Sequence, residues 1–358
     1  MSNINVFGAG YIGCVTAFCL GELGLNVTLF ERDKKKLELL KNEEPIFFER
    51  AFNWDEFYSF VTVKNIEEYK SNSDGQPGSF CLLCVNVELS EDGYDFKKVS
   101  ELIKDVRLNG DTPVLRSTIG PGEVDILSEE LGFEFLIWPE FLREGSAIYD
   151  FKKDDNFISG PILQAEKLEN IVGLPFIHAP NAETLCALKT MSNAFRALKV
   201  SFANSVPELF KQIDVEWFNA YFPQLRGNGD GLYLKSGAPF GGYCLPKELE
   251  YISSKMEKIE QSNFYAASLA FNEEQILRKA NEIISTGIKS LVVYGFNFKE
   301  GTDDIRNSPT FKVAMLLQKA GICVYDGDGS SKNTFHNSLG GEEASFGGSS
   351  DGKNSFNW

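Results

Sequence analysis

A cysteine in the stretch GGYCLPKE stands in a context that favours chemistry over packing. Cys244 follows two glycines and precedes a proline and a Lys–Glu pair. Pro246 suits the first turn of a helix, and LEYISSKMEK continues with helical periodicity, so Cys244 is expected at or just before a helix N-terminus. The helix dipole and Lys247 would lower the pKa of this thiol and favour the nucleophilic thiolate.

Other interpretations of Cys244 remain open at this point. A buried structural thiol is the usual role of a cysteine in a loop. A metal site is disfavoured, because no second cysteine or histidine lies nearby and the chain has only His178 and His336. The two preceding glycines would leave room for a substrate to approach.

Three pairs of polar residues are four positions apart, the spacing that places side chains on one helix face. A Lys–Asn pair after a dinucleotide domain suggests a dehydrogenase acting on a hydroxyl, because lysine can act as a base or stabilise an oxyanion. Taken alone, such a lysine more often lies on a solvated face. The pairs are Glu140 with Glu144, Lys189 with Asn193, and Cys244 with Glu248.

A glycine motif near the N-terminus predicts a dinucleotide site. VFGAGYIG places Gly8, Gly10 and Gly13 after a strand and at the start of a helix, where the loop approaches a pyrophosphate. The second strand ends in LFERD, so Glu31 is placed to bind the ribose hydroxyls of NAD and to repel the extra phosphate of NADP. The next residue is Arg32, whose positive charge weakens the preference for NAD over NADP that Glu31 alone would set. NAD is the expected cofactor.

Strands and helices alternate over the first half of the chain, a pattern typical of a parallel sheet. The expected strands are 4–8, 26–30, 79–85, 113–118 and 133–138. From about 180 the apolar spacing is helical, and a strand at 290–296, a helix and a second strand then make one βαβ-like unit.

We therefore expect an α/β protein with four segments. They are an N-terminal Rossmann-like doubly wound domain at 1–178, a central helical region with a long helix at 179–282, a partial C-terminal α/β domain at 283–328, and a flexible Gly-, Ser- and Asn-rich tail at 329–358.

Composition limits the partners. The net charge of −16 disfavours nucleic acid and anionic membrane surfaces as partners. The chain has no leader-like segment and no apolar run of the roughly 18 residues that span a membrane, so we expect a cytoplasmic protein. Seven scattered cysteines fit a reducing compartment, and Cys81 and Cys84, inside FCLLCV, are expected to pack in the core.

Together these stretches resemble the UDP-glucose/GDP-mannose dehydrogenase family, most closely the members that oxidise UDP-glucose. The resemblance covers roughly residues 3 to 328. Its specific pieces, in matching order, are GAGYIG, RSTIGPG, PEFLREGSAIYDF, LKTMSNAFRALKVSFAN, GGYCLPKE and GFNFKEGTDDIRNSP.

The resemblance implies a two-step, NAD-dependent oxidation of a sugar CH2OH to a carboxylate, in which Cys244 forms a thiohemiacetal and then a thioester. It assigns Lys189 and Asn193 to oxyanion stabilisation, and Thr118 and Glu144 to the catalytic water, with Glu144 as the acid/base. Glu248, four residues after the cysteine, is implied as a further catalytic residue. The implied NAD site comprises Gly8, Gly10, Tyr11, Ile12, Gly13, Glu31, Arg32 and Thr118. The implied UDP-sugar site comprises Glu140, Phe141, Leu142, Arg143, Glu144, Lys189, Asn193, Gly241, Lys299 and Arg306. A homodimer built on the central helices is also implied.

Four features depart from the family pattern. Glu248 stands where the family usually has Asp, Val87 where a threonine often meets the cofactor, and Pro239 where a glycine precedes the cysteine loop. The third domain is short. Alternative functions are therefore oxidation of GDP-mannose or another UDP-hexose, or a truncated, non-catalytic NAD-binding role.

Overall fold

The computed structural model describes residues 3–71, 78–90, 93–153, 156–228, 231, 233–259, 262–299 and 302–327. The chain divides into two compact units, residues 1–190 and residues 191–358. The finer division into four segments stays a prediction, and the expected tail at 329–358 lies outside the described residues. Within the described ranges, no helix is long and apolar enough to cross a membrane.

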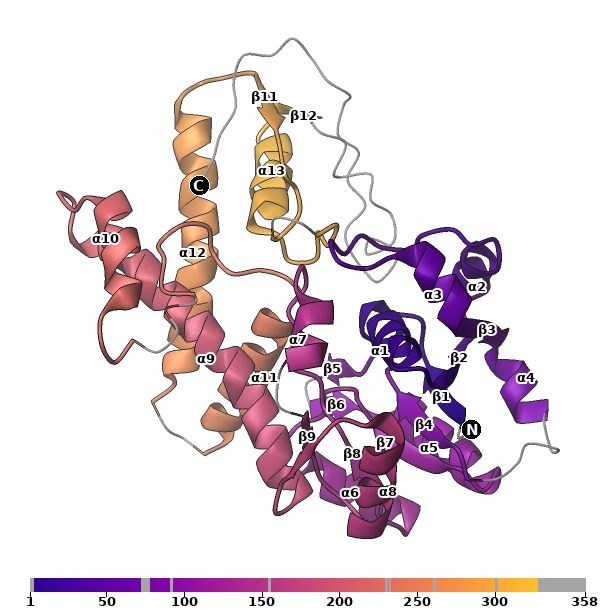
Figure 1. The fold of residues 1–358 in the computed structure, drawn as a ribbon. Coiled ribbons are helices and arrows are strands. Elements are labelled where there is room, and N and C mark those ends of the chain that lie inside the picture. Colours follow the sequence, from indigo (N-terminus) through magenta and orange to yellow (C-terminus); the bar gives the residue numbers. More distant parts are fainter. Residues whose placement is uncertain are drawn as a thin grey trace. The chain divides into compact units, whose positions relative to one another are not determined.

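A six-stranded sheet forms the centre of the first unit (Figure 1). All its strands are parallel, in the order β3-β2-β1-β4-β7-β8. The order reverses direction between β1 and β4, the switch point at which doubly wound sheets bind ligands. The strands are β1 Asn3–Phe7, β2 Asn26–Glu31, β3 Val61–Asn65, β4 Phe80–Leu83, β7 Thr112–Leu115 and β8 Leu136–Ile137. The expected Rossmann-like fold is confirmed.

Helices cover both faces of this sheet. Figure 1 shows α1 (Tyr11–Glu22) and α7 (Ala147–Lys153) on one face, with α5 (Lys97–Leu108) and α6 (Glu123–Leu131) on the other. The α1 helix is buried over most of its length, and α5 turns an apolar stripe inward through Val99, Leu102, Ile103 and Val106.

Shorter elements complete the first unit. They are α2 Lys34–Lys41, α3 Trp54–Phe60, α4 Ile66–Ser71, α8 Ile162–Val172, an antiparallel pair of β5 Glu88–Ser90 with β6 Gly93–Asp95, and a parallel pair of β9 Asn156–Ile158 with β10 Phe176–His178.

The edge strand β3 is absent from the strands expected from the sequence. The α3 helix ends at Phe60 and β3 begins at Val61, with no glycine, proline or polar turn to separate them. The expected strand at 133–138 is also shorter, because only Leu136 and Ile137 pair with β7.

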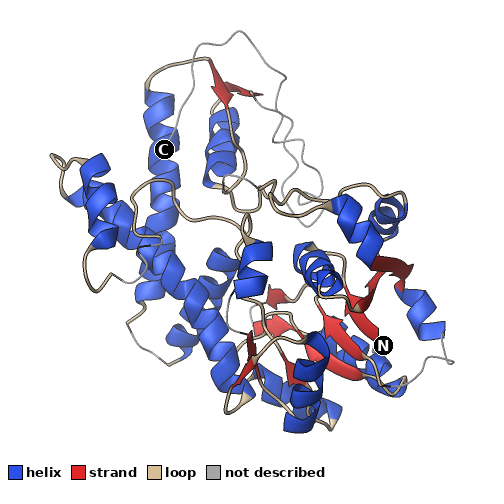
Figure 2. Cartoon of the chain, viewed as in Figure 1, coloured by secondary structure: helices blue, strands red, loops and turns tan. Residues whose placement is uncertain are grey.

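The second unit is mainly helical (Figure 2). The 28-residue helix α9 crosses the boundary between the units. The parallel pairing of β11 with β12 around α13 confirms the expected βαβ unit. The elements are α9 Ala182–Leu209, α10 Val215–Tyr221, the short 3-10 helix η1 Phe222–Gln224, α11 Cys244–Lys258, α12 Phe264–Ser285, β11 Ser290–Val293, α13 Pro309–Lys319 and β12 Cys323–Asp326.

Leu82 at the centre of the sheet tests the contribution of this core. It is fully buried on β4, so Leu82→Ala should lower the free energy of unfolding by about 2–5 kcal/mol. The matched control is Leu108→Ala, which makes the same change at a position that is 84% exposed and should alter stability by less than about 0.5 kcal/mol. Urea denaturation measures both, and equal losses would contradict this account of the core.

Candidate active site

The carboxyl ends of the parallel strands gather the expected polar residues of the first unit at one edge of the sheet. The glycine loop follows β1, and Glu31 ends β2. Thr118 follows β7, while Glu140 and Glu144 follow β8. Strands that run in parallel end at the same edge, so residues scattered over the sequence meet near the switch point.

The three motif glycines differ in what surrounds them. Gly8 has φ +97°, and a Cβ there would lie 2.8 Å from the carbonyl oxygen of Cys84. A Cβ on Gly13 would lie 1.9 Å from the carbonyl oxygen of Gly8. Among the described residues, no atom comes within 4 Å of the position that a Cβ on Gly10 would take. Two of the glycines are therefore required by packing, and the third faces open space.

The start of α1 fits the pyrophosphate of a dinucleotide. Gly10 is the N-cap, no side chain caps the helix, and its first turn carries no acidic residue. The N–H groups at such a helix start are suited to bind phosphate oxygens. Together with the open space at Gly10, this arrangement matches the expected cofactor.

Glu31 is buried and held in one orientation by backbone groups. One carboxylate oxygen accepts a hydrogen bond from Ala9 N at 2.8 Å, and the other accepts from Arg32 N at 2.7 Å and Asp33 N at 2.8 Å. A carboxylate has about four acceptor positions, so capacity remains for a ribose hydroxyl. The side chain of Arg32 is exposed.

Lys189 and Glu140 form a buried ion pair. Lys189 Nζ lies 2.9 Å from Glu140 Oε1, and the second oxygen of Glu140 accepts from Leu142 N at 2.8 Å. The ammonium also lies 5.3 Å from the centre of the Phe141 ring. Lys189 is only 3% exposed, so the interpretation of a solvated helix face is wrong.

Asn193 lies one turn beyond Lys189 on α9 and is also buried. Its Oδ1 accepts a hydrogen bond from Arg196 Nη1 at 3.3 Å. Its Nδ2 has no hydrogen-bond partner among the described residues. A buried donor of this kind is suited to bind an oxygen of a ligand.

Glu49 is a buried acid that the sequence analysis missed. It is 3% exposed, and it accepts hydrogen bonds from the Tyr11 hydroxyl at 2.5 Å, from Gly145 N at 2.6 Å and from Ala147 N at 3.3 Å. It thereby joins the start of α1 to the loop that carries Glu144. Burial, followed by the hydrogen bond to Glu49, raises the pKa of Tyr11 above its usual range. The sequence feature that could have indicated Glu49 is its position as a single acid in the aromatic run FFERAF.

The loop after Glu140 is held by a second buried acid. Arg143 forms a two-pronged ion pair with Asp150, with distances of 2.9 and 2.6 Å, and Asp150 is fully buried. The Arg143 guanidinium thus stabilises the loop that carries it. This structural role is additional to the substrate contact that the sequence predicts. Ile12 and Thr118 are both half-buried.

Cys81 behaves as a core residue, whereas Cys84 is half-buried. Cys81 is fully buried on β4, and burial raises its pKa. Burial also raises the pKa of Cys84 to about 11. Both thiols therefore stay protonated at neutral pH, which agrees with the expected packing role.

Cys244 is the first residue of α11, and the expected helix start is confirmed. The residue is exposed. Glu248 lies one turn further and is 1% exposed, with Lys247 Nζ 3.4 Å from its Oε1. On a helix, positions 244 and 248 share a face, so the thiol and this carboxylate are neighbours on α11.

The two glycines before Cys244 are required by protein contacts. A Cβ on Gly241 would lie 2.5 Å from the carbonyl oxygen of Asn307. Gly242 has φ +79°, and a Cβ there would lie 2.9 Å from the Phe298 ring. The packing against Asn307 and Phe298 thus explains both glycines, and the expected room for a substrate stays a prediction.

The loop after β11 lies against the cysteine loop. Arg306 pairs with fully buried Asp304 through contacts of 2.9 and 2.6 Å, and its guanidinium lies 4.9 Å from the centre of the Tyr243 ring. Lys299 in the same loop is exposed. Both expected cations of the nucleotide-sugar site thus belong to the loop that supports the cysteine loop.

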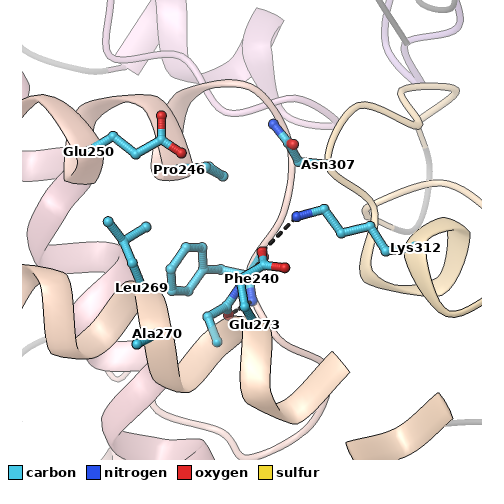
Figure 3. Close-up of a pocket in the computed structure, with 9 residues that line it drawn as sticks. Phe240, Pro246, Glu250, Leu269, Ala270, Glu273, Asn307 and Lys312 are labelled. Atoms are coloured by element: carbon cyan, nitrogen blue, oxygen red, sulfur yellow. Dashed lines mark hydrogen bonds and ion pairs between the residues drawn. The ribbon is translucent and has the colours of Figure 1, made fainter. Parts of the chain in front are cut away.

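A pocket of about 380 Å³ lies on the other side of the cysteine loop (Figure 3). Its wall includes Phe240 and, from α11, Pro246 and Glu250. At 100° per residue, these two α11 positions point about 200° and 240° away from Cys244. Lys312 in the wall is paired with Glu273 at 2.6 Å. The pocket therefore lies on a face of α11 that points away from the Cys244 side chain.

Sequence comparisons match the three consecutive parts of one enzyme family. The NAD binding domain of the UDP-glucose/GDP-mannose dehydrogenase family matches residues 2–172. The family's central domain matches residues 182–274, and its UDP binding domain matches residues 292–340. The chain belongs to this family. NAD is accordingly its cofactor, and the family reaction is the oxidation of a nucleotide sugar.

Three relatives are similar to most of the chain. The UDP-glucose 6-dehydrogenase of Rickettsia prowazekii is 28% identical, over 90% of this chain and 80% of its own length. The GDP-mannose 6-dehydrogenase of Pseudomonas aeruginosa is 27% identical, over 88% and 78%. A solved UDP-glucose dehydrogenase from Pyrobaculum islandicum has a TM-score of 0.81 and 26% identity, covering 98% of this chain and 86% of that chain.

The glycines of this dehydrogenase allow a test of the cofactor loop. Gly10→Ala should leave thermal stability nearly unchanged while weakening NAD binding about 10-fold or more, because the added methyl points into space that we assign to the pyrophosphate. Gly13→Ala should instead destabilise the fold, because its methyl overlaps the carbonyl of Gly8. Thermal unfolding and calorimetric NAD titration separate the two effects. Unchanged NAD affinity in a folded Gly10→Ala protein would contradict the assignment.

Proposed function

We propose that this dehydrogenase converts UDP-glucose to UDP-glucuronate through a covalent intermediate on Cys244. The observation that carries the proposal is the position of this thiol as the exposed first residue of α11, one residue beyond a glycine pair packed against Asn307 and Phe298. A helix start favours the thiolate over the thiol.

The covalent route divides the oxidation into two steps. NAD, when bound, accepts a hydride in each step. The Cys244 sulfur adds to the carbon of the aldehyde formed first, and the aldehyde oxygen takes a proton to give a thiohemiacetal. Oxidation of this adduct leaves a thioester. Water then breaks the C–S bond, which releases the acid and returns the thiol.

The buried polar groups of α9 suit the first oxidation. The substrate hydroxyl would lose its proton to Glu144 as general base while its carbon loses a hydride to NAD. Lys189 and Asn193 would donate to the substrate oxygen as its negative charge develops. The burial of Lys189 beside Glu140 supports these roles, as does Asn193 Nδ2, which has no hydrogen-bond partner among the described residues. Thr118 and Glu144 would orient the water that attacks the thioester, and Glu49 holds the loop next to Glu144.

The choice of UDP-glucose rests on the named relatives. The Rickettsia prowazekii and Bacillus subtilis UDP-glucose enzymes are 28% and 29% identical to this chain. GDP-mannose is the second candidate, because the Pseudomonas aeruginosa enzyme is 27% identical over a similar range. Lys299 and Arg306 would bind the diphosphate, which both substrates share.

The decisive experiment counts NADH with each sugar nucleotide. We expect UDP-glucose to yield two NADH per sugar and to be used faster than GDP-mannose. Cys244→Ala should lower acid formation by at least about 10³-fold, the scale on which loss of a nucleophile acts, while NAD affinity stays unchanged. Cys323→Ala is the matched control, since it removes another exposed cysteine of the same unit. A preference for GDP-mannose, or tight NAD binding without turnover, would replace the proposal with one of its alternatives.

We also propose that the enzyme is a homodimer that pairs through α9. Exposed apolar side chains at Met191, Phe195, Phe202 and Leu209 fall within about 40° of one another on the helix and form one stripe. Four such side chains on one face are typical of a helix–helix interface.

A charge in this stripe tests the dimer. Phe202→Glu should convert the dimer to a monomer in sedimentation experiments, because a carboxylate would be buried against apolar side chains. Phe264→Glu, which changes a similarly exposed phenylalanine on α12, is the control and should remain dimeric. A monomeric wild-type protein would refute this proposal and leave the catalytic proposal untouched.

A further inference from the structure

The segment that leads to Cys244 is held by asparagine side chains. Residues 236–240 form no strand and no helix. Three asparagines from three different helices each bond a backbone N–H and a backbone C=O of this segment. We call these residues the asparagine clamp: Asn219 on α10, Asn204 on α9 and Asn272 on α12.

The hydrogen bonds of the clamp follow one another along the segment. Asn219 accepts a hydrogen bond from Ser236 N at 2.8 Å and donates one to Ser236 O at 2.9 Å. Asn204 accepts from Gly237 N at 2.8 Å and donates to Ala238 O at 3.1 Å. Asn272 then accepts from Phe240 N at 2.8 Å and donates to Phe240 O at 3.1 Å.

A carboxamide is suited to this task because it carries the same donor and acceptor groups as a peptide. When it bonds both the N–H and the C=O of one residue, it reproduces the paired bonds of two antiparallel strands. The segment thus gains the order of a strand without lying in a sheet. Buried peptide groups need such partners, and both Asn204 and Asn272 are buried.

Of the three asparagines, Asn272 bonds the residue closest in sequence to Cys244, which is Phe240. It fixes Phe240, whose side chain lies between α11 and α12 in the pocket wall (Figure 3). Two residues further, Gly242 N donates to Arg306 O at 2.9 Å, and Gly242 O accepts from Asn307 Nδ2 at 3.0 Å. The chain is therefore held on both sides of Gly241, immediately before Tyr243 and Cys244.

We infer that Asn272 is a positioning residue for the second oxidation. The inference rests on the proposed role of Cys244. Alcohol oxidation to the aldehyde needs no thiol, whereas capture of the aldehyde requires the sulfur to meet its carbonyl carbon. A loosened segment would therefore slow the second step selectively, and a displacement of about 1 Å at a reacting atom can lower a rate by about 100-fold.

Asn272→Ala provides the test, with Asn219→Ala as the matched control. Both changes remove two backbone hydrogen bonds from the same segment, but Asn219 holds Ser236, four residues further from Cys244. With UDP-glucose and the aldehyde trap semicarbazide, Asn272→Ala should form acid roughly 10- to 100-fold more slowly. It should yield nearer one NADH than two per sugar and accumulate trapped aldehyde. Asn219→Ala should stay within about 2-fold of wild type on each measure.

A second readout does not depend on turnover. The rate of Cys244 alkylation by iodoacetamide, followed by mass spectrometry of its peptide, should change at least about 3-fold in Asn272→Ala and remain at the wild-type value in Asn219→Ala. If Asn272→Ala does not fold, Asn272→Asp keeps the acceptor for Phe240 N and replaces only the donor to Phe240 O.

The outcomes separate the two proposals. Wild-type enzyme that forms no acid contradicts the proposed function, and the alkylation comparison still decides the clamp. Equal effects of the two alanine variants, or wild-type stoichiometry and alkylation in Asn272→Ala, would overturn the positioning role.

Discussion

Every buried peptide group needs a hydrogen-bond partner, and this requirement shapes the region around Cys244. In the part of the chain that the structure describes, no strand pairs with the segment before the cysteine, and Asn204, Asn219 and Asn272 bond its N–H and C=O groups. The helices α9, α10 and α12 are thereby tied to one loop. The irregular segment that leads to the first residue of α11, Cys244, is thus held by side chains from three helices.

Close contact between backbone segments is the second constraint on this structure, and such contacts usually require glycine. Gly13 touches the carbonyl of Gly8, which itself touches Cys84, so the first turn of the cofactor loop has no space for a side chain. Gly241 and Gly242 allow the loop around Asn307 to approach in the same way. Gly10 differs, because its side is open. The distinction between packing and binding glycines follows from what lies beside each one.

Buried acids hold the polar side chains of the first unit in place. Glu140 pairs with Lys189, Glu31 accepts three backbone N–H groups, and Glu49 joins Tyr11 to Gly145. Burying a charge is unfavourable unless it is paired or hydrogen-bonded, and each of these carboxylates has such partners. The result is a set of fixed orientations at the carboxyl edge of the sheet, the edge that also carries the glycine loop after β1.

The sequence by itself determined the family, the glycine loop, the parallel sheet and the helix that begins at Cys244. These features depend on local spacing: strand periodicity, a three-glycine motif, and a proline in a first turn. Only the tertiary structure decided the partners of Glu49, which lie 38 and 96 residues away, and the partners of Asn272, 32 residues away. A single buried acid or an asparagine on a helix carries no local sign of such a contact. The packing of distant elements creates these bonds, and with them the positions of the candidate site residues.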